Sequence, residues 1–358
     1  MENQIIVVKP TNRCNLSCKY CYDQSKGHLE DMSIETLYNT TNKFGGYFKD
    51  RNLRFLWHGG EPLLVGRPFY EKALSFQRKF SDKVDIHNSI QTNLTCLTED
   101  FADFIIENRF SLSFSLDGPI LINNQTRVYE DGRGSYKEVE EGISILKKKG
   151  IKPRALLVLT KKNKESLPEI YNFFKDNNIP FKVHALVYSG RAKNQKDLSL
   201  SPKEHADSLV KLFDIWFNDN EFKIKVDPLY QFIGNLTTNT SIDCYLSENC
   251  QDNFISVASN GDVYPCWRFD GLTDFKYGNI NRDSLDKILD SPVRRELLTR
   301  RSKNLEECCN CSFGNICNSG CMNNAYNNGD IMDKDIYCES YKKVYQHINS
   351  HLSKINKK

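Results

Sequence analysis

The chain has 358 residues, of which 39% are hydrophobic and 27% charged, and its 49 basic and 46 acidic residues leave a formal net charge of +3. This composition is typical of a globular protein with a sizeable core, and it excludes intrinsic disorder. Because basic and acidic residues nearly balance, the composition does not indicate a positively charged surface for binding nucleic acid. No apolar run approaches the ~18 residues of a membrane span and no secretory signal is visible, so we expect a cytoplasmic protein that binds neither membrane nor nucleic acid.

The first part of the chain alternates strand and helix patterns. In chain order, the predicted strands are 5–8, 53–57, 84–91, 110–116, 152–159 and 181–187, and the predicted helices are 33–48, 68–80, 98–108, 136–149, 167–177 and 202–217. Six strands interleaved with helices indicate parallel β/α units wound into a barrel or an open doubly wound sheet. Functional residues are then expected at the carboxyl ends of the strands.

The later part of the chain is rich in Cys and Asn, with short strand signals at 254–257 and 262–264. We predict a core domain over 1–235, a cysteine-rich domain over 236–340, and a C-terminal helix with a basic tail over 341–358.

Unusual residues follow four successive predicted strands. Cysteines follow the first, and the other three groups are His58-Gly59-Gly60-Glu61-Pro62, Gln91-Thr92-Asn93 and Ser115-Leu116-Asp117-Gly118. Because parallel strands end at one edge of a sheet, these groups are expected on one rim.

Thirteen cysteines in a reduced compartment indicate metal binding or catalysis rather than disulfides. Cys14, Cys18 and Cys21 form a C-x3-C-x2-C run. Three thiolates leave one iron of a four-iron cluster open to an outside ligand. The alternative is a zinc site with a distant fourth ligand, but zinc sites usually pair two C-x2-C motifs.

Residues 14–22 resemble the signature of the radical S-adenosylmethionine (SAM) superfamily, whose fold is a partial (β/α)6 barrel. The resemblance implies that SAM chelates the open iron and is reductively cleaved to a 5′-deoxyadenosyl radical, with electrons from a flavodoxin- or ferredoxin-type donor. It also implies SAM contacts, which are Tyr20 at the adenine, Gly59, Gly60 and Glu61 at the amino group, Gln91 and Ser115 at the ribose or methionine, and Arg127 at the carboxylate. Taken alone, Arg127 favours a structural role.

Nine further cysteines lie in the cysteine-rich part. Eight of them, all but Cys309, would be enough to fill two four-iron clusters, although two structural zinc sites would satisfy the same count. Their pattern resembles the SPASM domain of enzymes that modify peptides and proteins. The resemblance implies one auxiliary cluster on Cys244, Cys250, Cys266 and Cys321, and another on Cys308, Cys311, Cys317 and Cys338. With the first site this makes three [4Fe–4S] clusters, and Cys96 and Cys309 have no assigned role.

The overall layout resembles the anaerobic sulfatase-maturing enzymes, which oxidise Cys or Ser to formylglycine. Their proposed base is an Asp directly after the cysteine of the G-x4-C motif, where this chain has Trp267. Asp117, Asp262 and Asp270 are substitute candidates that the sequence does not place, and Arg268 is a candidate on the substrate side.

The missing Asp leads us to favour a maturase that forges thioether or carbon–carbon crosslinks in ribosomal peptides over formylglycine formation. Because only a short segment precedes Cys14, such an enzyme is expected to bind its precursor directly or to use a separate leader-binding protein. An iron–sulfur electron-transfer protein would explain the thiolates but not the segment Gly59-Gly60-Glu61-Pro62.

Overall fold

The computed structural model describes residues 3–23, 30–48, 52–219, 223–241, 244–248, 250–300 and 304–355. These residues form one ten-stranded sheet in the order β10-β9-β8-β1-β2-β3-β4-β5-β6-β7. The first seven strands in chain order are β1 (Asn3–Val8), β2 (Asn52–Trp57), β3 (Ile86–Thr92), β4 (Ser111–Ser115), β5 (Arg154–Leu159), β6 (Phe181–Ala185) and β7 (Val226–Asp227). Each pairs in parallel with the next.

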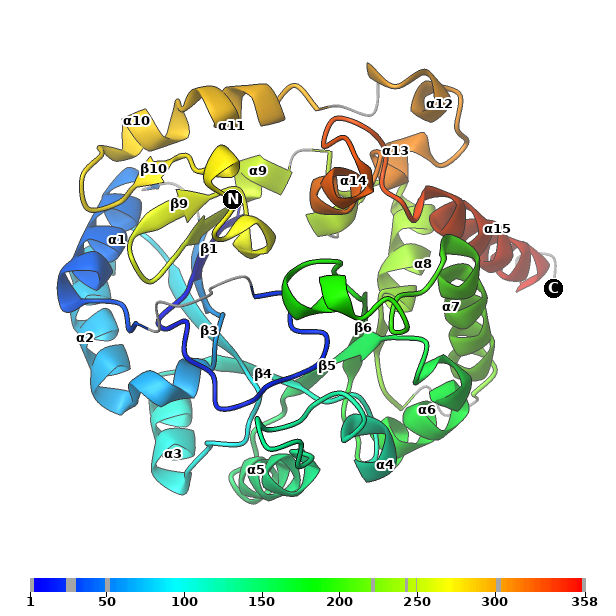
Figure 1. Cartoon of the computed structure of the whole chain (residues 1–358), viewed down its shortest axis with the longest axis horizontal. Helices are drawn as coiled ribbons and strands as arrows, with labels where there is room; N and C mark the ends of the chain where they lie inside the picture. Colours follow the sequence, from blue (N-terminus) through cyan, green and yellow to red (C-terminus); the bar gives the residue numbers. More distant parts are fainter. Residues whose placement is uncertain are drawn as a thin grey trace.

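Helices cover the outer face of the curved sheet, as Figure 1 shows. They are α1 (Ile34–Tyr47), α2 (Arg67–Gln77), α3 (Glu99–Glu107), α4 (Ile120–Asn123), α5 (Tyr136–Lys148), α6 (Leu167–Asp176), α7 (Pro202–Phe217) and α8 (Leu229–Thr238). Because β7 and β10 end the strand order at opposite edges, the barrel is open. The predicted α/β class with a partial barrel is confirmed.

Element boundaries differ from the prediction for identifiable reasons. The strand predicted from residue 152 begins at Arg154, because the preceding Pro153 has no N–H for the ladder. The helix predicted over 68–80 ends at Gln77 and tightens into a 3-10 turn over Arg78–Phe80. Local capping agrees with the sequence, since Ser33 accepts a hydrogen bond from the backbone N of Thr36 at the start of α1.

The cysteine-rich part continues the same sheet. β8 (Phe254–Val257) pairs in parallel with β1, and β9 (Asp262–Tyr264) and β10 (Gly278–Asn279) follow antiparallel. Short helices complete this part, namely α9 (Cys250–Asn253), α10 (Leu285–Leu289), α11 (Pro292–Leu297), α12 (Glu306–Cys309), α13 (Gly314–Cys317) and α14 (Met322–Asn328). The strand β1 therefore lies between β2 of the first part of the chain and β8 of the cysteine-rich part.

The C-terminal helix α15 (Cys338–Ile355) packs along α7. The end of the predicted basic tail, residues 356–358, lies outside the described residues. In the part of the chain that the structure describes, no helix is long and apolar enough to cross a membrane.

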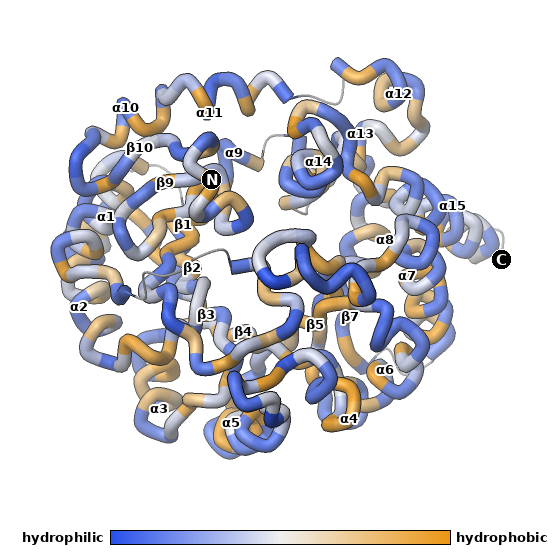
Figure 2. Tube along the Cα trace, in the orientation of Figure 1, coloured by the Kyte–Doolittle hydropathy of each residue, from blue (hydrophilic) through white to orange (hydrophobic). Residues whose placement is uncertain are grey.

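The core lies between the sheet and its helices. Figure 2 shows apolar residues along β1, β5 and β7, and alternating polar and apolar residues along the surrounding helices. A buried polar group within this core is fully partnered, because Asn88 accepts from Trp57 Nε1 at 3.0 Å and exchanges two hydrogen bonds with Gln77. This packing holds β1 to β4 in place, and the residue groups that the sequence analysis singled out follow the ends of these four strands.

Candidate functional site

The first cysteine loop leaves the end of β1 as a group of free thiols. Burial raises the pKa of Cys18 to about 11, with Arg127 acting in the opposite direction. Burial, and then the charge of Glu61, raise the pKa of Cys14, and Cys18 and Cys21 add to this rise as neighbouring thiols. Thiols in such surroundings become thiolates when a metal supplies the compensating charge.

The glycine segment after β2 packs directly on this loop. The backbone N of Glu61 donates to Arg13 O at 2.7 Å. Gly60 has φ +56°, and a Cβ there would lie 2.4 Å from the same Arg13 oxygen. Only glycine fits both the left-handed backbone and the close approach.

The Glu61 side chain is fully buried and already partnered by the protein. Its carboxylate accepts from Leu63 N at 2.9 Å, Thr92 Oγ1 at 2.6 Å and Asn93 N at 2.7 Å. Burial raises its pKa to about 6, although these hydrogen bonds act to lower it. Glu61 thus holds the loop after β2 against the end of β3, and a SAM amino group would share this carboxylate with three donors.

Two asparagines tie the cysteine loop to the end of β3: Asn93, which belongs to a group expected on the rim, and Asn15, which the sequence analysis did not select. Asn93 Nδ2 donates to Asn15 Oδ1 at 2.8 Å, and Asn15 Nδ2 donates to Thr95 Oγ1 at 2.8 Å. Asn15 Nδ2 also lies 3.3 Å from Cys96 Sγ. The signal was present, because Asn15 lies inside the cysteine run and Asn93 ends a predicted strand.

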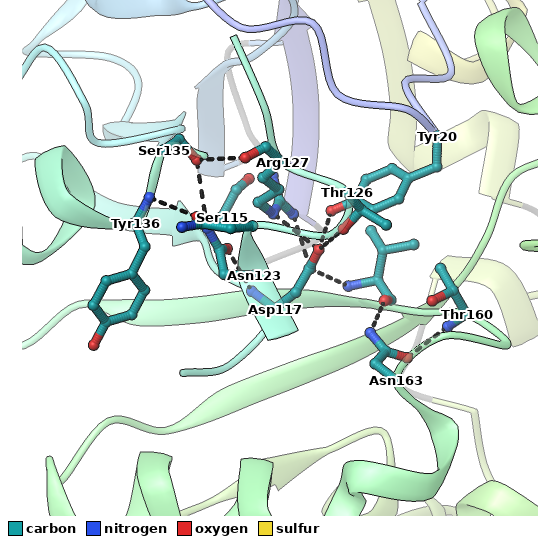
Figure 3. Close-up of polar contacts among 12 residues, drawn as sticks. Tyr20, Ser115, Asp117, Asn123, Thr126, Arg127, Ser135, Tyr136, Thr160 and Asn163 are labelled. Atoms are coloured by element: carbon teal, nitrogen blue, oxygen red, sulfur yellow. Dashed lines mark hydrogen bonds and ion pairs between the residues drawn. The ribbon is translucent and has the colours of Figure 1, made fainter. Parts of the chain in front are cut away.

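Asp117 is the buried hub of the opposite side of the rim, as Figure 3 shows. Its carboxylate accepts from Tyr20 OH, from Thr126 Oγ1 at 3.0 Å and from Val158 N at 3.1 Å. Arg127 Nη2 lies 3.3 Å from Asp117 Oδ1. Asp117 therefore positions Tyr20 and Arg127 together.

Arg127 is a buried cation with one carboxylate and one aromatic neighbour. Its guanidinium lies 5.3 Å from the centroid of the Tyr20 ring. Burial acts to lower the pKa of Arg127, but Asp117, Tyr20 and Cys18 together outweigh it and the pKa is raised. The charge required for a SAM carboxylate is present, and Asp117 holds it in place.

Gln91 and Ser115 meet across adjacent strands. Gln91 Nε2 donates to Ser115 Oγ at 3.1 Å, and Gln91 Oε1 accepts from Ser113 Oγ at 2.6 Å. The structure thus brings these two predicted SAM contacts together on β3 and β4.

Trp267, at the position expected for a base, lies in an aromatic cluster with Tyr22 and His58. The Trp267 ring stacks on His58 with centroids 5.1 Å apart and lies 4.4 Å from the Tyr22 ring. Tyr22 OH and His58 Nδ1 are 3.1 Å apart. Burial, and then the charge of Lys9, lower the pKa of His58 to about 4, so its imidazole is neutral at pH 7.

The three carboxylates proposed as substitutes for the missing Asp are all engaged elsewhere. Asp270 is paired with the buried Lys9, and Asp262 accepts from Asn279 Nδ2 at 2.8 Å on the far strands. Asp117 is the hub described above. Asp270 does lie close to Trp267, since its backbone N donates to Trp267 O at 3.4 Å, but its carboxylate is paired with Lys9.

Arg268 turns toward a thiol. Its Nη1 lies 3.6 Å from Cys321 Sγ and 3.3 Å from Asn324 Oδ1. Burial acts to lower the pKa of Arg268, while Cys321, Cys266 and Cys244 raise it, and the net shift is upward. The positive charge of Arg268 therefore lies beside Cys321, Cys266 and Cys244, where it would stabilise negative charge on their sulfur atoms.

The C-terminal thiols fall into two spatial groups. Cys250 experiences repulsion from three thiols, and these are Cys266, Cys321 and Cys244. Cys317 experiences repulsion from three others, which are Cys338, Cys308 and Cys311. A cavity is lined by all four members of this second group. Each group joins cysteines distant in sequence, and the assignment of these groups as the ligands of two auxiliary clusters stays a prediction.

Two buried residues missed by the sequence analysis hold these groups together. Arg300 donates to backbone carbonyls on two separate loops, at Gly320 (3.0 Å) and Asp333 (2.8 Å). Asp335 accepts from the backbone N of Cys321 at 2.9 Å and of Tyr337 at 2.8 Å. Nothing in their local sequence marks these roles, because all the partners are backbone groups or distant in the chain.

The donor sets fit iron–sulfur clusters chemically. Thiolates are the ligands that iron–sulfur clusters and zinc prefer, and the two C-terminal groups each offer four. The first loop offers three thiols, with the polar groups of Tyr20, Gln91, Ser115 and Arg127 on the same rim. A cluster with one open iron and a polar organic ligand would be accommodated there.

Two protein families match the sequence. The Radical SAM superfamily matches residues 8–174, and the SPASM family, an iron–sulfur cluster-binding domain, matches residues 244–312. A cysteine-type anaerobic sulfatase-maturating enzyme of Clostridium novyi is 30% identical over 374 residues, covering 100% of this chain and 98% of the relative. A serine-type enzyme of Bacteroides thetaiotaomicron is 28% identical, covering 98% and 91%.

Solved structures give the same likeness. Native anSMEcpe with bound AdoMet and Cp18Cys peptide superposes with a TM-score of 0.88 at 27% identity, covering 99% of this chain and 98% of that chain. Streptococcus suis SuiB bound to its precursor peptide SuiA has a TM-score of 0.67 at 19% identity, covering 93% and 75%. The second likeness concerns the fold alone.

Proposed function

Since the chain belongs to the radical SAM and SPASM family that includes the anaerobic sulfatase-maturating enzymes, we propose that it oxidises a Cys or Ser side chain of a protein substrate to formylglycine. The observation that carries this proposal is whole-length similarity to these enzymes, and it is supported by the polar groups of Tyr20, Gln91, Ser115 and Arg127 on one rim. This reverses the preference from sequence alone, which had favoured peptide crosslinking because of a single residue, Trp267.

The cofactors proposed are SAM and three [4Fe–4S] clusters on the thiol groups described above. Tyr20, Glu61 and Arg127 would hold SAM at the first cluster, where it would supply the radical chemistry needed to remove a hydrogen atom from a substrate carbon. The chain's own part is positional: Gly60 and Asn93 fix the cysteine loop, while Asp117 orients Tyr20 and Arg127 toward the same rim. A flavodoxin- or ferredoxin-type protein is the proposed electron donor.

A peptide crosslink remains a second candidate, and Trp267 is the observation that favours it. Oxidation of a Cys –CH2–SH group requires loss of the thiol proton as well as a carbon-bound hydrogen. The indole of Trp267 cannot accept that proton, so formylglycine formation needs another acceptor. A thioether crosslink loses the thiol proton as well, whereas a maturase that joins two carbons has no thiol proton to remove, so Trp267 favours carbon–carbon crosslinking in particular. A separate leader-binding protein is the proposed partner of such a maturase.

The test is an anaerobic assay of the reconstituted, reduced enzyme with SAM and sulfatase-type peptides carrying Cys, Ser or Ala at the target position. Mass spectrometry follows both the peptide and 5′-deoxyadenosine. We expect formylglycine from the Cys or Ser peptide and no product from the Ala peptide. Abundant deoxyadenosine with all three peptides untouched would overturn the proposal and favour the crosslinking candidate. A Cys14→Ala variant, which removes one thiol of the first loop, is the control for deoxyadenosine formation.

A further inference from the structure

The helices α7 and α15 run side by side at the edge of the molecule (Figure 1). Near the start of both, His205 Nδ1 lies 2.7 Å from Ser340 Oγ. Lys343 and Asp207 form an ion pair about one turn later. We call this line of contacts the α7–α15 seam, and it continues to a third, more distal group.

The distal group contains two imidazoles and one carboxylate, which are His347, His351 and Asp214. Their potential ligand atoms all lie within 4.8 Å of one another. The Nε2 atom of His347 is 2.6 Å from Asp214 Oδ1, and the Nε2 atom of His351 is 4.0 Å from the same oxygen. The two histidines are four residues apart, so they share one face of α15.

These separations suit a transition-metal ion. Metal–nitrogen and metal–oxygen bonds of about 2.0–2.1 Å in tetrahedral geometry place neighbouring ligand atoms about 3.3 Å apart. The observed 2.6 and 4.0 Å fall on either side of that value. Small side-chain rotations would equalise them, with the ion taking the place of the proton that joins His347 to Asp214.

The hydrogen bonding of His351 leaves the required lone pair free. Its Nδ1 lies 3.0 Å from the backbone oxygen of His347, and only a protonated nitrogen can donate to a carbonyl. In the neutral ring, Nε2 is then the unprotonated nitrogen, and it is the atom on the Asp214 side. A backbone carbonyl behind a ligand histidine is the usual means of fixing its tautomer and orientation.

Aromatic rings wall the site on the α7 side. The ring of Phe213 meets His347 edge-on at 5.6 Å and His351 at 5.5 Å, and Phe217 lies 6.0 Å from His351. Both histidine side chains retain 26% exposure and Asp214 retains 42%, so an ion and its water can enter. Lys343, one of the seam cations, is paired with Asp207.

We propose that Asp214, His347 and His351 bind a divalent zinc-class cation that clasps α15 to α7. Three protein ligands leave a fourth position for water. The clasp would hold the helix whose first residue is Cys338, a member of the second C-terminal thiol group. This site lies outside the SAM rim and does not depend on the proposed reaction.

The test uses the cluster-loaded enzyme, equilibrated anaerobically with excess Zn²⁺ and desalted. Zinc and iron are measured by elemental analysis, and zinc ligation by X-ray absorption. The variants are His351→Gln and Asp214→Asn. The control is His87→Gln, which removes an exposed histidine that also pairs with a carboxylate, 3.0 Å from Asp85.

We expect the wild type and His87→Gln to retain one more zinc than His351→Gln or Asp214→Asn, at equal iron content. The extra zinc should show nitrogen and oxygen neighbours at about 2.0–2.1 Å rather than sulfur at about 2.3 Å. Zinc should also raise the unfolding temperature of the wild type and of His87→Gln only. Equal zinc in all four proteins, or sulfur-only ligation of the extra zinc, would overturn the proposal.

Discussion

Trp267 stacks on His58 with ring planes 19° apart and centroids separated by 5.1 Å. The residue that follows Cys266 thus contributes an apolar surface where the family relatives are expected to carry an acid. The proposed formylglycine reaction therefore needs a proton acceptor other than residue 267, and the first prediction concerns this requirement.

Replacing Trp267 with Asp restores a carboxylate beside Cys266. Because a positioned general base typically contributes about 10²–10⁴-fold, we expect formylglycine formation from the Cys peptide to rise at least about 10-fold. Peptide mass spectrometry gives the product, and deoxyadenosine yield normalises for radical formation. Trp267→Phe keeps the aromatic stack and should leave the yield near that of the wild type. An unchanged yield in Trp267→Asp would mean that the missing carboxylate does not limit the reaction.

Replacing Asp117 with Asn leaves Arg127 as a buried charge without its partner. Loss of one member of a buried pair costs about 3–5 kcal/mol, so the free energy of unfolding should fall by that order. Denaturant unfolding measures this, and equilibrium dialysis should show weaker SAM binding, since Tyr20 and Arg127 both lose their anchor.

The control for this experiment acts on the same carboxylate. Thr126→Val removes a single hydrogen bond to Asp117, which should cost only about 0.5–1.5 kcal/mol. Equal losses in the two variants would show that the Asp117–Arg127 pair is not the main contribution.

Replacing Gly60 with Ala should disrupt the first cysteine loop. The new Cβ would lie 2.4 Å from Arg13 O at a backbone φ of +56°, so the loop must move. We expect reduced iron content and little deoxyadenosine. Gly46→Ala, in α1 with nothing within 4 Å of the new Cβ, is the matched control and should be neutral or stabilising by up to about 1 kcal/mol. Full iron loading in Gly60→Ala would contradict the close-approach argument.

Acidification should weaken the α7–α15 seam through His205. Burial lowers the pKa of His205 from 6.5 to about 4, so the unfolded chain binds this proton more readily than the folded one. The stabilising contribution is complete above pH 6.5 and is lost as the pH falls toward 4, by up to about 3 kcal/mol. The unfolding midpoint of the wild type should therefore fall more steeply over this range than that of His205→Gln. The exposed His87→Gln variant should keep the wild-type slope, and parallel slopes in all three proteins would exclude His205.

The alternation of strands and helices was predictable because short apolar or alternating segments such as β1, β4 and β5, bounded by turn residues, are separated by longer segments with helical periodicity. The short strands β7 and β10 and the helices α10, α11 and α14 were missed, since elements of two to seven residues have too little periodicity to be recognised alone. The pairing of β8 with β1 was also beyond the sequence, because nothing local specifies a partner some 250 residues away.

For the site, the sequence by itself determined which residues are candidates for the chemistry, because the three-cysteine run, the glycine segment and the eight later thiols form recognisable motifs. Tertiary structure alone decided how they are held. Folding places the Asp117 carboxylate against the Arg127 guanidinium and the Glu61 carboxylate against the Thr92 hydroxyl. It also lets Arg300 donate hydrogen bonds to two separate loops. It also decided that Trp267 rests on His58 and that His347 and His351 meet Asp214. These relationships depend on contacts between residues far apart in the chain, and a buried charge or imidazole takes its role from the partners that folding brings to it.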